Sequence, residues 1–74
     1  MAKPGQHVVP NGSGWSVKRA GASKASSVHR TQDEAVLAAT KLARRQQTEL
    51  YVHGRDGRIR DRSSYGSDPH PPKG

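Results

Sequence analysis

The dipeptide Asp56-Gly57 is the feature that most limits how this chain can fold. It lies in the stretch from Leu50 to Ser63, LYVHGRDGRIRDRS, between two runs of strand-like residues. Asp-Gly is typical of a two-residue hairpin loop in a type I′ turn, because glycine adopts positive φ freely and aspartate tolerates it. The sequence therefore predicts a β-hairpin with Asp56 and Gly57 as its loop.

This loop determines which residues pair across the hairpin, and alternation then gives the hairpin two unlike faces. The predicted pairs are Arg55 with Arg58, Gly54 with Ile59, His53 with Arg60, Val52 with Asp61, Tyr51 with Arg62, and Leu50 with Ser63. The face that can be buried contains Leu50, Val52 and Ile59, with Asp61 at its margin. The basic face contains Tyr51, His53, Arg55, Arg58, Arg60 and Arg62.

The chain has 74 residues, which is room for one small domain. Valine, leucine and isoleucine total ten residues, phenylalanine is absent, and the net charge is +7. These values lie on the disordered side of the compositional border, but the few apolar residues recur at strand and helix spacing. We therefore expect a domain with a thin core over residues 6–65, a flexible N-terminus over residues 1–5 and a Pro/Gly-rich tail over residues 66–74.

Three strands are predicted ahead of a helix. The first covers residues 6–10, and the second covers residues 15–18, where apolar and polar side chains alternate. Trp15 is the largest apolar side chain of the chain, and we expect it to anchor the core. A weaker third strand covers residues 25–30 and rests mainly on Val28.

A helix is predicted from Thr31 to about Gln47. The segment TQDE is predicted to be a capping box, in which the Thr31 hydroxyl accepts from the backbone N–H of Glu34 and the Glu34 carboxylate accepts from the N–H of Thr31. Its apolar side contains Ala35, Ala39, Leu42 and Ala43, and its outer side contains Leu37, Thr40, Lys41, Arg44 and Arg45. The fold class predicted is α+β, a small antiparallel sheet in the order β-β-β-α-β-β with one helix packed on one face.

The chain contains, in order, the segments HVVP, GWSVKRAG, A-S-x-x-H-R-T-Q-D-E-A, A-x-x-x-A, E-L-x-V-H-G-R-D-G-R-I and SYGSDPHPP. From about His7 to Pro72 this succession resembles a family of small bacterial proteins catalogued as domain-of-unknown-function family 2188. The resemblance implies a bacterial or phage-borne protein with strands before and after one helix, and it implies no activity and no site residues. Many relatives are expected to carry an aromatic residue at the position of Val28, so the resemblance also implies a leaner core here.

The sequence lacks the patterns that are typical of an enzyme. His7, His29, His53 and His70 do not have the short spacings of a zinc site, and there is no cysteine. Walker, G-x-S-x-G and G-x-G-x-x-G motifs are absent. We therefore predict a non-catalytic protein without cofactor, metal or small-molecule substrate. The lack of a long apolar run predicts no membrane association and a cytoplasmic location.

The excess of positive charge favours an anionic partner. The first hypothesis is that the basic face of the hairpin binds nucleic acid, with DNA favoured over RNA. A two-stranded ribbon fits the major groove of DNA, and Tyr51 can instead stack on an unpaired base. A secondary basic patch on the helix, consisting of Lys41, Arg44 and Arg45, is the next candidate.

The alternative hypothesis is a homo-oligomerising protein-interaction module without a nucleic-acid role, in which the arginines are solvated charges. A homodimer is expected because a helix whose buried face is mostly alanine covers little of a sheet. The candidate contacts are the edge of the first strand, the edge of the strand after Gly57, and Leu37 on the outer helix face.

Overall fold

Five strands and one helix follow one another in the predicted order in a computed structural model that describes residues 5–65. The strands are β1 (Gln6–Asn11), β2 (Gly14–Arg19), β3 (Ser27–His29), β4 (Glu49–His53) and β5 (Ile59–Ser64), and the helix is α1 (Gln32–Gln46). The predictions for the N-terminus before Gly5 and for the tail over residues 66–74 lie outside the described residues.

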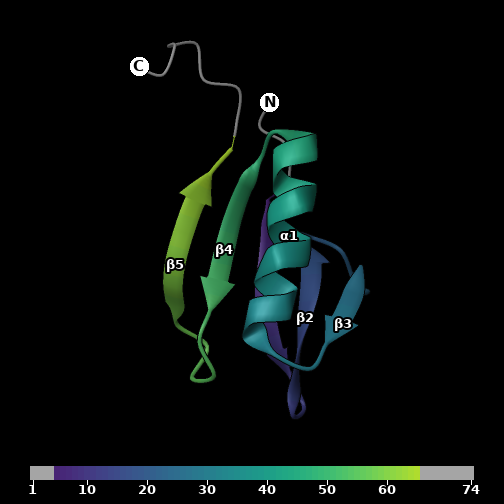
Figure 1. Cartoon of the computed structure of the whole chain (residues 1–74). Helices are drawn as coiled ribbons and strands as arrows, with labels where there is room; N and C mark the ends of the chain where they lie inside the picture. Colours follow the sequence, from purple (N-terminus) through teal and green to yellow (C-terminus); the bar gives the residue numbers. More distant parts are fainter. Residues whose placement is uncertain (1–4, 66–74) are drawn as a thin grey trace.

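All five strands belong to one sheet in the order β3-β2-β1-β4-β5, with α1 on one face (Figure 1). The α+β class with one helix on one face is confirmed. The sheet is mixed, because β1 and β4 are parallel whereas the other three pairings are antiparallel. The helix between the two hairpins lets the chain return in the same direction, as a parallel pairing requires. β1 is therefore the central strand, and its predicted role as an open edge is wrong; the edges are β3 and β5.

The core lies between α1 and the sheet face that it covers. Trp15 is only 7% exposed, which confirms its predicted place in the core. The predicted helix face is also confirmed, because Ala35, Ala39 and Ala43 are fully buried and Leu42 packs beside them. The remaining buried apolar side chains come from the sheet and are Val8, Val17, Leu50 and Val52.

The strand β3 is shorter than predicted and contributes little to this core. Val28 pairs with Ser16, and directly paired residues share a face, so its side chain lies on the face away from the helix. It is 62% exposed. The prediction that a small residue at this position makes the core leaner is therefore wrong, because position 28 faces away from the core.

The two ends of α1 are capped by local hydrogen bonds. At the N-terminus the Thr31 hydroxyl accepts from the Glu34 N–H at 3.1 Å, as predicted, whereas the Glu34 carboxylate accepts from the N–H of Arg30. At the C-terminus Gln47 is left-handed with φ 56°, and the N–H of Thr48 donates to the Ala43 carbonyl at 2.9 Å. This is a Schellman motif, whose left-handed position is usually occupied by glycine.

Replacing Gln47 with glycine is expected to stabilise the protein. A left-handed conformation costs a non-glycine residue about 1–2 kcal/mol, and the greater flexibility of glycine in the unfolded chain offsets about half of the gain. We expect a net stabilisation of about 0.5–1 kcal/mol, seen as a melting temperature several degrees higher. Lys41→Gly is the matched control. Lys41 is an exposed residue inside α1, so the same new residue should destabilise there by about 1 kcal/mol.

Candidate nucleic-acid interface

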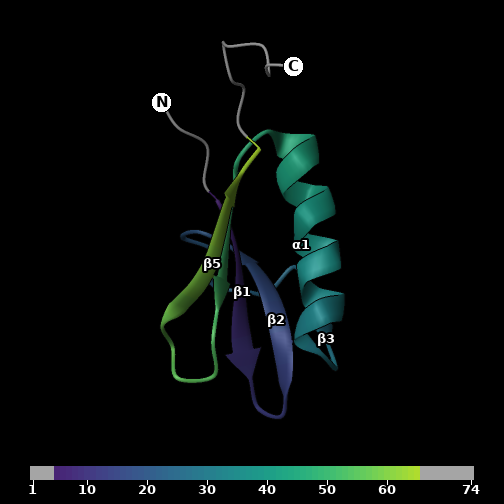
Figure 2. The same ribbon diagram turned by 60° about the vertical axis from the view of Figure 1, so that its left-hand side comes forward.

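No helix or strand of residues 5–65 packs on the sheet face opposite α1 (Figure 2). The loop between β2 and β3 borders this face at Ser16, which is buried, and at Lys18. The strand pairings identify the residues of this uncovered face, because paired residues share a face and neighbours alternate. They are His7, Val9 and Asn11 from β1, Ser16 and Lys18 from β2, Val28 from β3, Glu49, Tyr51 and His53 from β4, and Ile59, Arg62 and Ser64 from β5. Aromatic rings, cations and a few apolar side chains are thus mixed on one surface.

Three rings, those of His7, Tyr51 and His53, lie in contact at the centre of the uncovered face and are called the row of rings below. His7 stacks on Tyr51 with ring centroids 4.8 Å apart and an interplanar angle of 22°. This separation equals the spacing of neighbouring strands, so the ring planes lie across the line that joins the strands. His7 and Tyr51 therefore present the edges of their rings, and not the faces that stack on each other, to a ligand. These edges carry the N–H and O–H groups.

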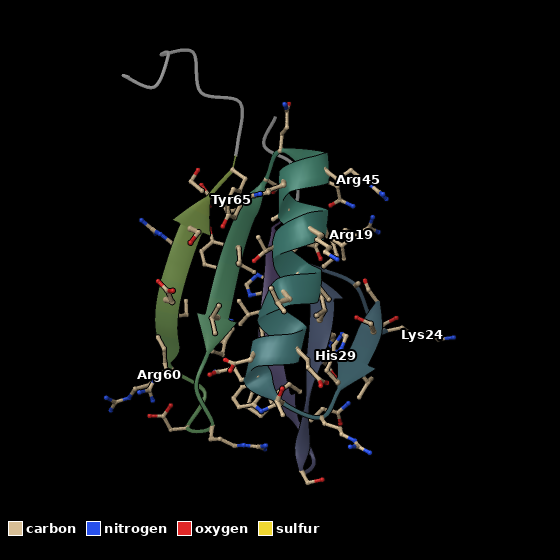
Figure 3. All side chains as sticks on the ribbon, in the orientation of Figure 1. Arg19, Lys24, His29, Arg45, Arg60 and Tyr65 are labelled. Carbon is tan, nitrogen blue, oxygen red and sulfur yellow. The ribbon has the colours of Figure 1, made fainter. Side chains whose placement is uncertain are left out.

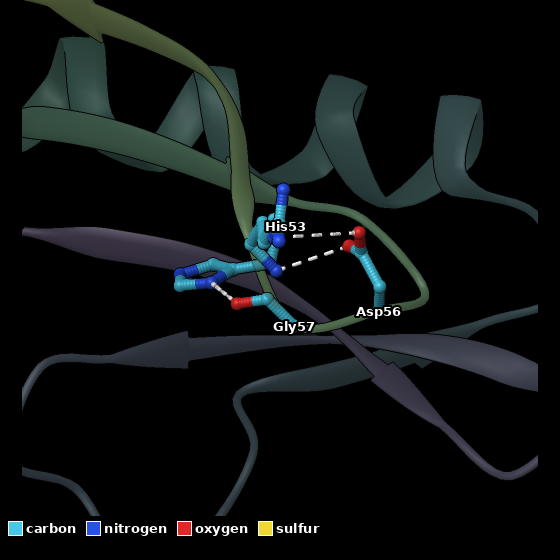
Figure 4. A network of polar contacts seen from close by, with 4 residues as sticks. His53, Asp56 and Gly57 are labelled. Carbon is cyan, nitrogen blue, oxygen red and sulfur yellow. Dashed lines mark hydrogen bonds and ion pairs between the residues drawn. The ribbon is translucent and has the colours of Figure 1, made fainter.

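The two histidines of the row are hydrogen-bonded to each other. His7 Nδ1 lies 2.9 Å from His53 Nε2, and His53 Nδ1 lies 3.4 Å from the Gly57 carbonyl at the hairpin tip, a contact drawn in Figure 4. The carbonyl can only accept, so His53 carries its proton on Nδ1 and accepts on Nε2, and His7 donates from Nδ1. Burial lowers the pKa of His7, and repulsion from His53, when that ring is also protonated, acts in the same direction.

Tyr51 is held by charged groups on the same face. Its hydroxyl donates to the Glu49 carboxylate, and this hydrogen bond raises the pKa of Tyr51. Arg62 is paired with Tyr51 across the hairpin, and its charge acts in the opposite direction on that pKa. Of the predicted basic face, the structure thus brings Tyr51, His53 and Arg62 together on one surface.

The hairpin tip has a different turn from the one predicted. The Gly57 N–H donates to the Gly54 carbonyl at 2.9 Å, and the Gly54 N–H donates to the Arg58 carbonyl at 2.7 Å. Gly57 has φ 87°, whereas Asp56 is not among the described residues with positive φ. The loop is therefore a three-residue type I turn with a glycine bulge, and the predicted type I′ turn is wrong.

The longer loop changes the pairing near the tip and leaves it unchanged below. His53 pairs with Ile59 instead of Arg60, while Val52 still pairs with Asp61 and the pairs beyond are as predicted. A β-bulge at Arg60 absorbs the one-residue difference. Ile59 consequently lies on the uncovered face and is 54% exposed, so its predicted burial is wrong.

Arg58 and Arg60 lie at the exposed end of the hairpin. Arg58 forms a weak ion pair with Asp56, with 3.9 Å between the Arg58 Nε and the Asp56 Oδ2. The Asp56 carboxylate also accepts from the Arg58 N–H (Figure 4). The side chain of Arg60 passes over Gly54, where an added Cβ would come within 2.6 Å of its Cδ. Figure 3 shows Arg60 directed away from the body of the molecule. Both guanidinium groups are open to a ligand that reaches the tip.

Arg55 does not belong to this surface. Its guanidinium donates to the carbonyls of Gly12 and Ser13 at 2.7 and 2.8 Å and lies 4.7 Å from the ring centroid of Trp15. It therefore joins the tips of the two hairpins and covers the core tryptophan by a cation–π contact. The predicted grouping of Arg55 with the other arginines of the hairpin is wrong, because these contacts draw its side chain to the other hairpin.

The secondary basic patch on α1 is separate from the uncovered face. Lys41, Arg44 and Arg45 are exposed on the helix, and Arg44 lies over the ring of Tyr65 at 5.5 Å. Figure 3 shows Arg45 near the end of the helix and Arg60 near the opposite end of the molecule. The contact with Tyr65 also confirms that this residue packs back on the core.

Two residues of the uncovered face were missed by the sequence analysis of the binding site. His7 lies beside Tyr51 only because β1 and β4 are parallel neighbours, and no local pattern shows this. Lys18 is the direct partner of His7 on β2. The alternation in the segment GWSVKR already placed Lys18 on the outer face, so this residue could have been found.

Metal binding and membrane insertion find no support in the described part of the chain. Among residues 5–65, no group of three or more metal-ligating side chains comes together. No described helix is long and apolar enough to cross a membrane. A groove of about 550 Å³ runs along α1 and is lined mainly by helix residues together with Ser26 and Ser27.

Taken together, the geometry is that of a small α+β domain with one covered and one uncovered sheet face, and comparison with known proteins places it in a family. The family DUF2188, described as an uncharacterized protein conserved in bacteria, matches residues 6–65, and the chain belongs to it. The chain is similar to the uncharacterized protein YdaT of Bacillus subtilis (strain 168), with 36% identity over 62 residues. The match covers 84% of this chain and 41% of that relative. No solved structure matches significantly.

Proposed function

We propose that the protein is a cytoplasmic, non-catalytic nucleic-acid-binding protein that holds the phosphate backbone against the uncovered sheet face, with DNA favoured over RNA. The observation that carries the proposal is the combination of ring edges with the cations Lys18 and Arg62 on a face that the helix leaves open. Hydrogen-bond donors and positive charge on one surface are what phosphate oxygens require.

The arrangement favours contacts to the backbone over contacts to bases. A base cannot stack between His7 and Tyr51, because these two rings already stack on each other. We expect one base at most to stack on Tyr51, on the face of the ring that His7 does not cover and next to Arg62. Binding that depends mainly on phosphates is insensitive to sequence and sensitive to salt.

The β4–β5 hairpin supports the preference for DNA. The helix packs on β1 to β4, and β5 lies beyond its cover at the sheet edge (Figure 1). A two-stranded ribbon of this kind fits the major groove of B-form DNA, whereas the major groove of A-form RNA is too narrow for it. Arg58 and Arg60 at the tip would then reach the phosphates on the groove wall.

The test is a salt-titrated binding assay with duplex DNA, single-stranded DNA and RNA side by side. Replacing Arg58, Arg60 and Arg62 together with alanine is expected to weaken binding and to flatten the salt dependence by roughly one unit of slope per lost phosphate contact. The matched control replaces Lys41, Arg44 and Arg45, which removes the same charge from the helix. If the helix variant loses the affinity and the hairpin variant keeps it, the site is the secondary basic patch.

A second candidate function is self-association as a homodimer without nucleic acid. It is favoured by the exposure of three apolar side chains, Val28 at 62%, Leu37 at 65% and Ile59 at 54%. Sedimentation equilibrium distinguishes the two proposals. A dimer that Leu37→Glu dissociates, in a protein that binds no polyanion at low salt, would replace the nucleic-acid proposal by this one.

A further inference from the structure

The hydrogen-bonded histidines on the uncovered face leave one nitrogen without a partner among the described residues. His53 Nδ1 faces the Gly57 carbonyl, His53 Nε2 faces His7 Nδ1, and this chain of contacts uses three of the four ring nitrogens. The fourth is Nε2 of His7, at the end of the ring that is farther from the backbone. In the neutral pair this nitrogen carries a lone pair, so it repels an anion.

A single proton added to His7 Nε2 turns this repulsion of an anion into attraction. Protonation of His7 at Nε2 keeps the donated hydrogen bond from Nδ1 to His53 and adds a charged N–H donor at the end of the ring that is farther from the backbone. A charge-assisted hydrogen bond from this N–H to a phosphate oxygen is about twice as strong as a neutral one. Lys18 is the direct strand partner of His7, so the two side chains leave the same face of the sheet at neighbouring positions.

We infer that His7 and Lys18 form a phosphate-binding site on the uncovered face, at which a phosphodiester group of the nucleic acid binds together with one proton taken up by His7 Nε2. The inference rests on the proposed nucleic-acid binding and specifies where on the face a phosphate is held. His53 is a positioning residue, because it fixes the tautomer and the orientation of the His7 ring from the other side.

The surrounding charges decide when the proton is taken up. The groups that face the pair are Lys18 from β2, Glu49 and Tyr51 from β4 and Arg62 from β5, and α1 lies behind the sheet. Burial holds the pKa of His7 below its ordinary value of 6.5 in the free protein, and repulsion from His53, when that ring is also protonated, acts in the same direction. A bound phosphate favours the charged ring, so the pKa of His7 rises when the nucleic acid binds. The affinity for the nucleic acid therefore increases as the pH falls from the pKa of His7 in the complex to its pKa in the free protein.

The experiment measures the dissociation constant of a labelled mixed-sequence DNA strand as a function of pH at constant ionic strength. For one proton taken up, affinity is expected to rise up to about tenfold per pH unit as the pH falls from about 7.5 to about 6. His7→Gln is expected to remove this dependence on pH, so that the affinity of the variant no longer rises as the pH falls. The matched control is His29→Gln, since His29 bonds Ser27 and lies outside the ring row; it should keep the full dependence.

Titration of the His7 ring by NMR, with and without the DNA strand, tests the same step in the unchanged protein. The inference predicts that the pKa of His7 rises when DNA is added and that Nε2 gains the proton. Binding that is independent of pH, or a pKa of His7 that DNA leaves in place, would overturn the phosphate site and leave the proposed function standing. A protein that binds no nucleic acid at either pH would overturn both.

Discussion

Replacing Trp15 with alanine is expected to unfold the protein at room temperature. Truncating a buried tryptophan costs about 3–5 kcal/mol, and a single core in a chain of this size supplies rarely more than about that amount. Trp15 is the only large aromatic side chain among the buried residues of the described chain, whose other apolar members are valines, alanines and one leucine. Neighbouring side chains as small as these cannot fill the space that the indole leaves.

The same change also removes the platform on which Arg55 lies. The guanidinium of Arg55 would lose its cation–π contact, while its hydrogen bonds to Gly12 and Ser13 would lose the surface that orients them. Circular dichroism and a denaturant titration provide the measurement. Leu37→Ala is the matched control, because this large apolar residue is 65% exposed and should change stability little. A folded Trp15→Ala variant with an unchanged denaturation midpoint would show that the core lies elsewhere.

Replacing Gly57 with valine is expected to destabilise the protein by about 2–3 kcal/mol, because a β-branched residue resists a left-handed backbone. Gly57 has φ 87°, and a Cβ at this position would meet no atom within 4 Å. The effect is therefore one of backbone conformation alone, without a steric clash with the surroundings. Asparagine tolerates the left-handed region better, so Gly57→Asn should cost about 1 kcal/mol. Thermal unfolding of both variants measures the difference.

The two possible turns make different predictions for Asp56. In a type I′ turn Asp56 would also need positive φ, and Asp56→Val would be as harmful as Gly57→Val. In the observed turn Asp56 is not among the described residues with positive φ, and its carboxylate accepts from the Arg58 N–H and pairs weakly with the Arg58 side chain. We therefore expect Asp56→Val to cost less than half as much as Gly57→Val. Equal losses for the two changes would restore the type I′ assignment.

Local signals predicted the helix and its packing well. The Thr31 hydroxyl cap and the alanine face of α1 depend on near neighbours in the sequence, and the structure confirms both, whereas the Glu34 carboxylate accepts from the N–H of Arg30 instead of Thr31. The hairpin was predicted in place but with the wrong loop, since Asp-Gly occurs both in two-residue loops and at the end of three-residue loops. Pairing below the tip was still correct, because the bulge at Arg60 compensates for the extra loop residue. No local pattern shows a bulge of this kind, and Ile59 was therefore placed on the wrong face.

Long-range neighbours were the part of the candidate site that the sequence did not reveal. His7 and His53 are 46 positions apart, and only the parallel pairing of β1 with β4 brings them into contact. Arg55 was assigned to the binding surface on alternation alone, whereas the carbonyls of the other hairpin and the ring of Trp15 determine where its guanidinium lies. Tyr51 and Arg62 were correctly placed opposite each other, because their pairing lies below the bulge.

The central position of β1 has a consequence for how the chain folds. Each hairpin closes a short loop, and α1 forms from residues that are neighbours in sequence, so these parts can form early and independently. The pairing of Gln6 with Leu50 instead requires the closure of a long loop that contains β2, β3 and the whole helix. We therefore expect the joining of the two hairpins to be the slow step of folding. Before that step, each hairpin has an unpaired strand edge, and the uncovered face with its row of rings does not yet exist.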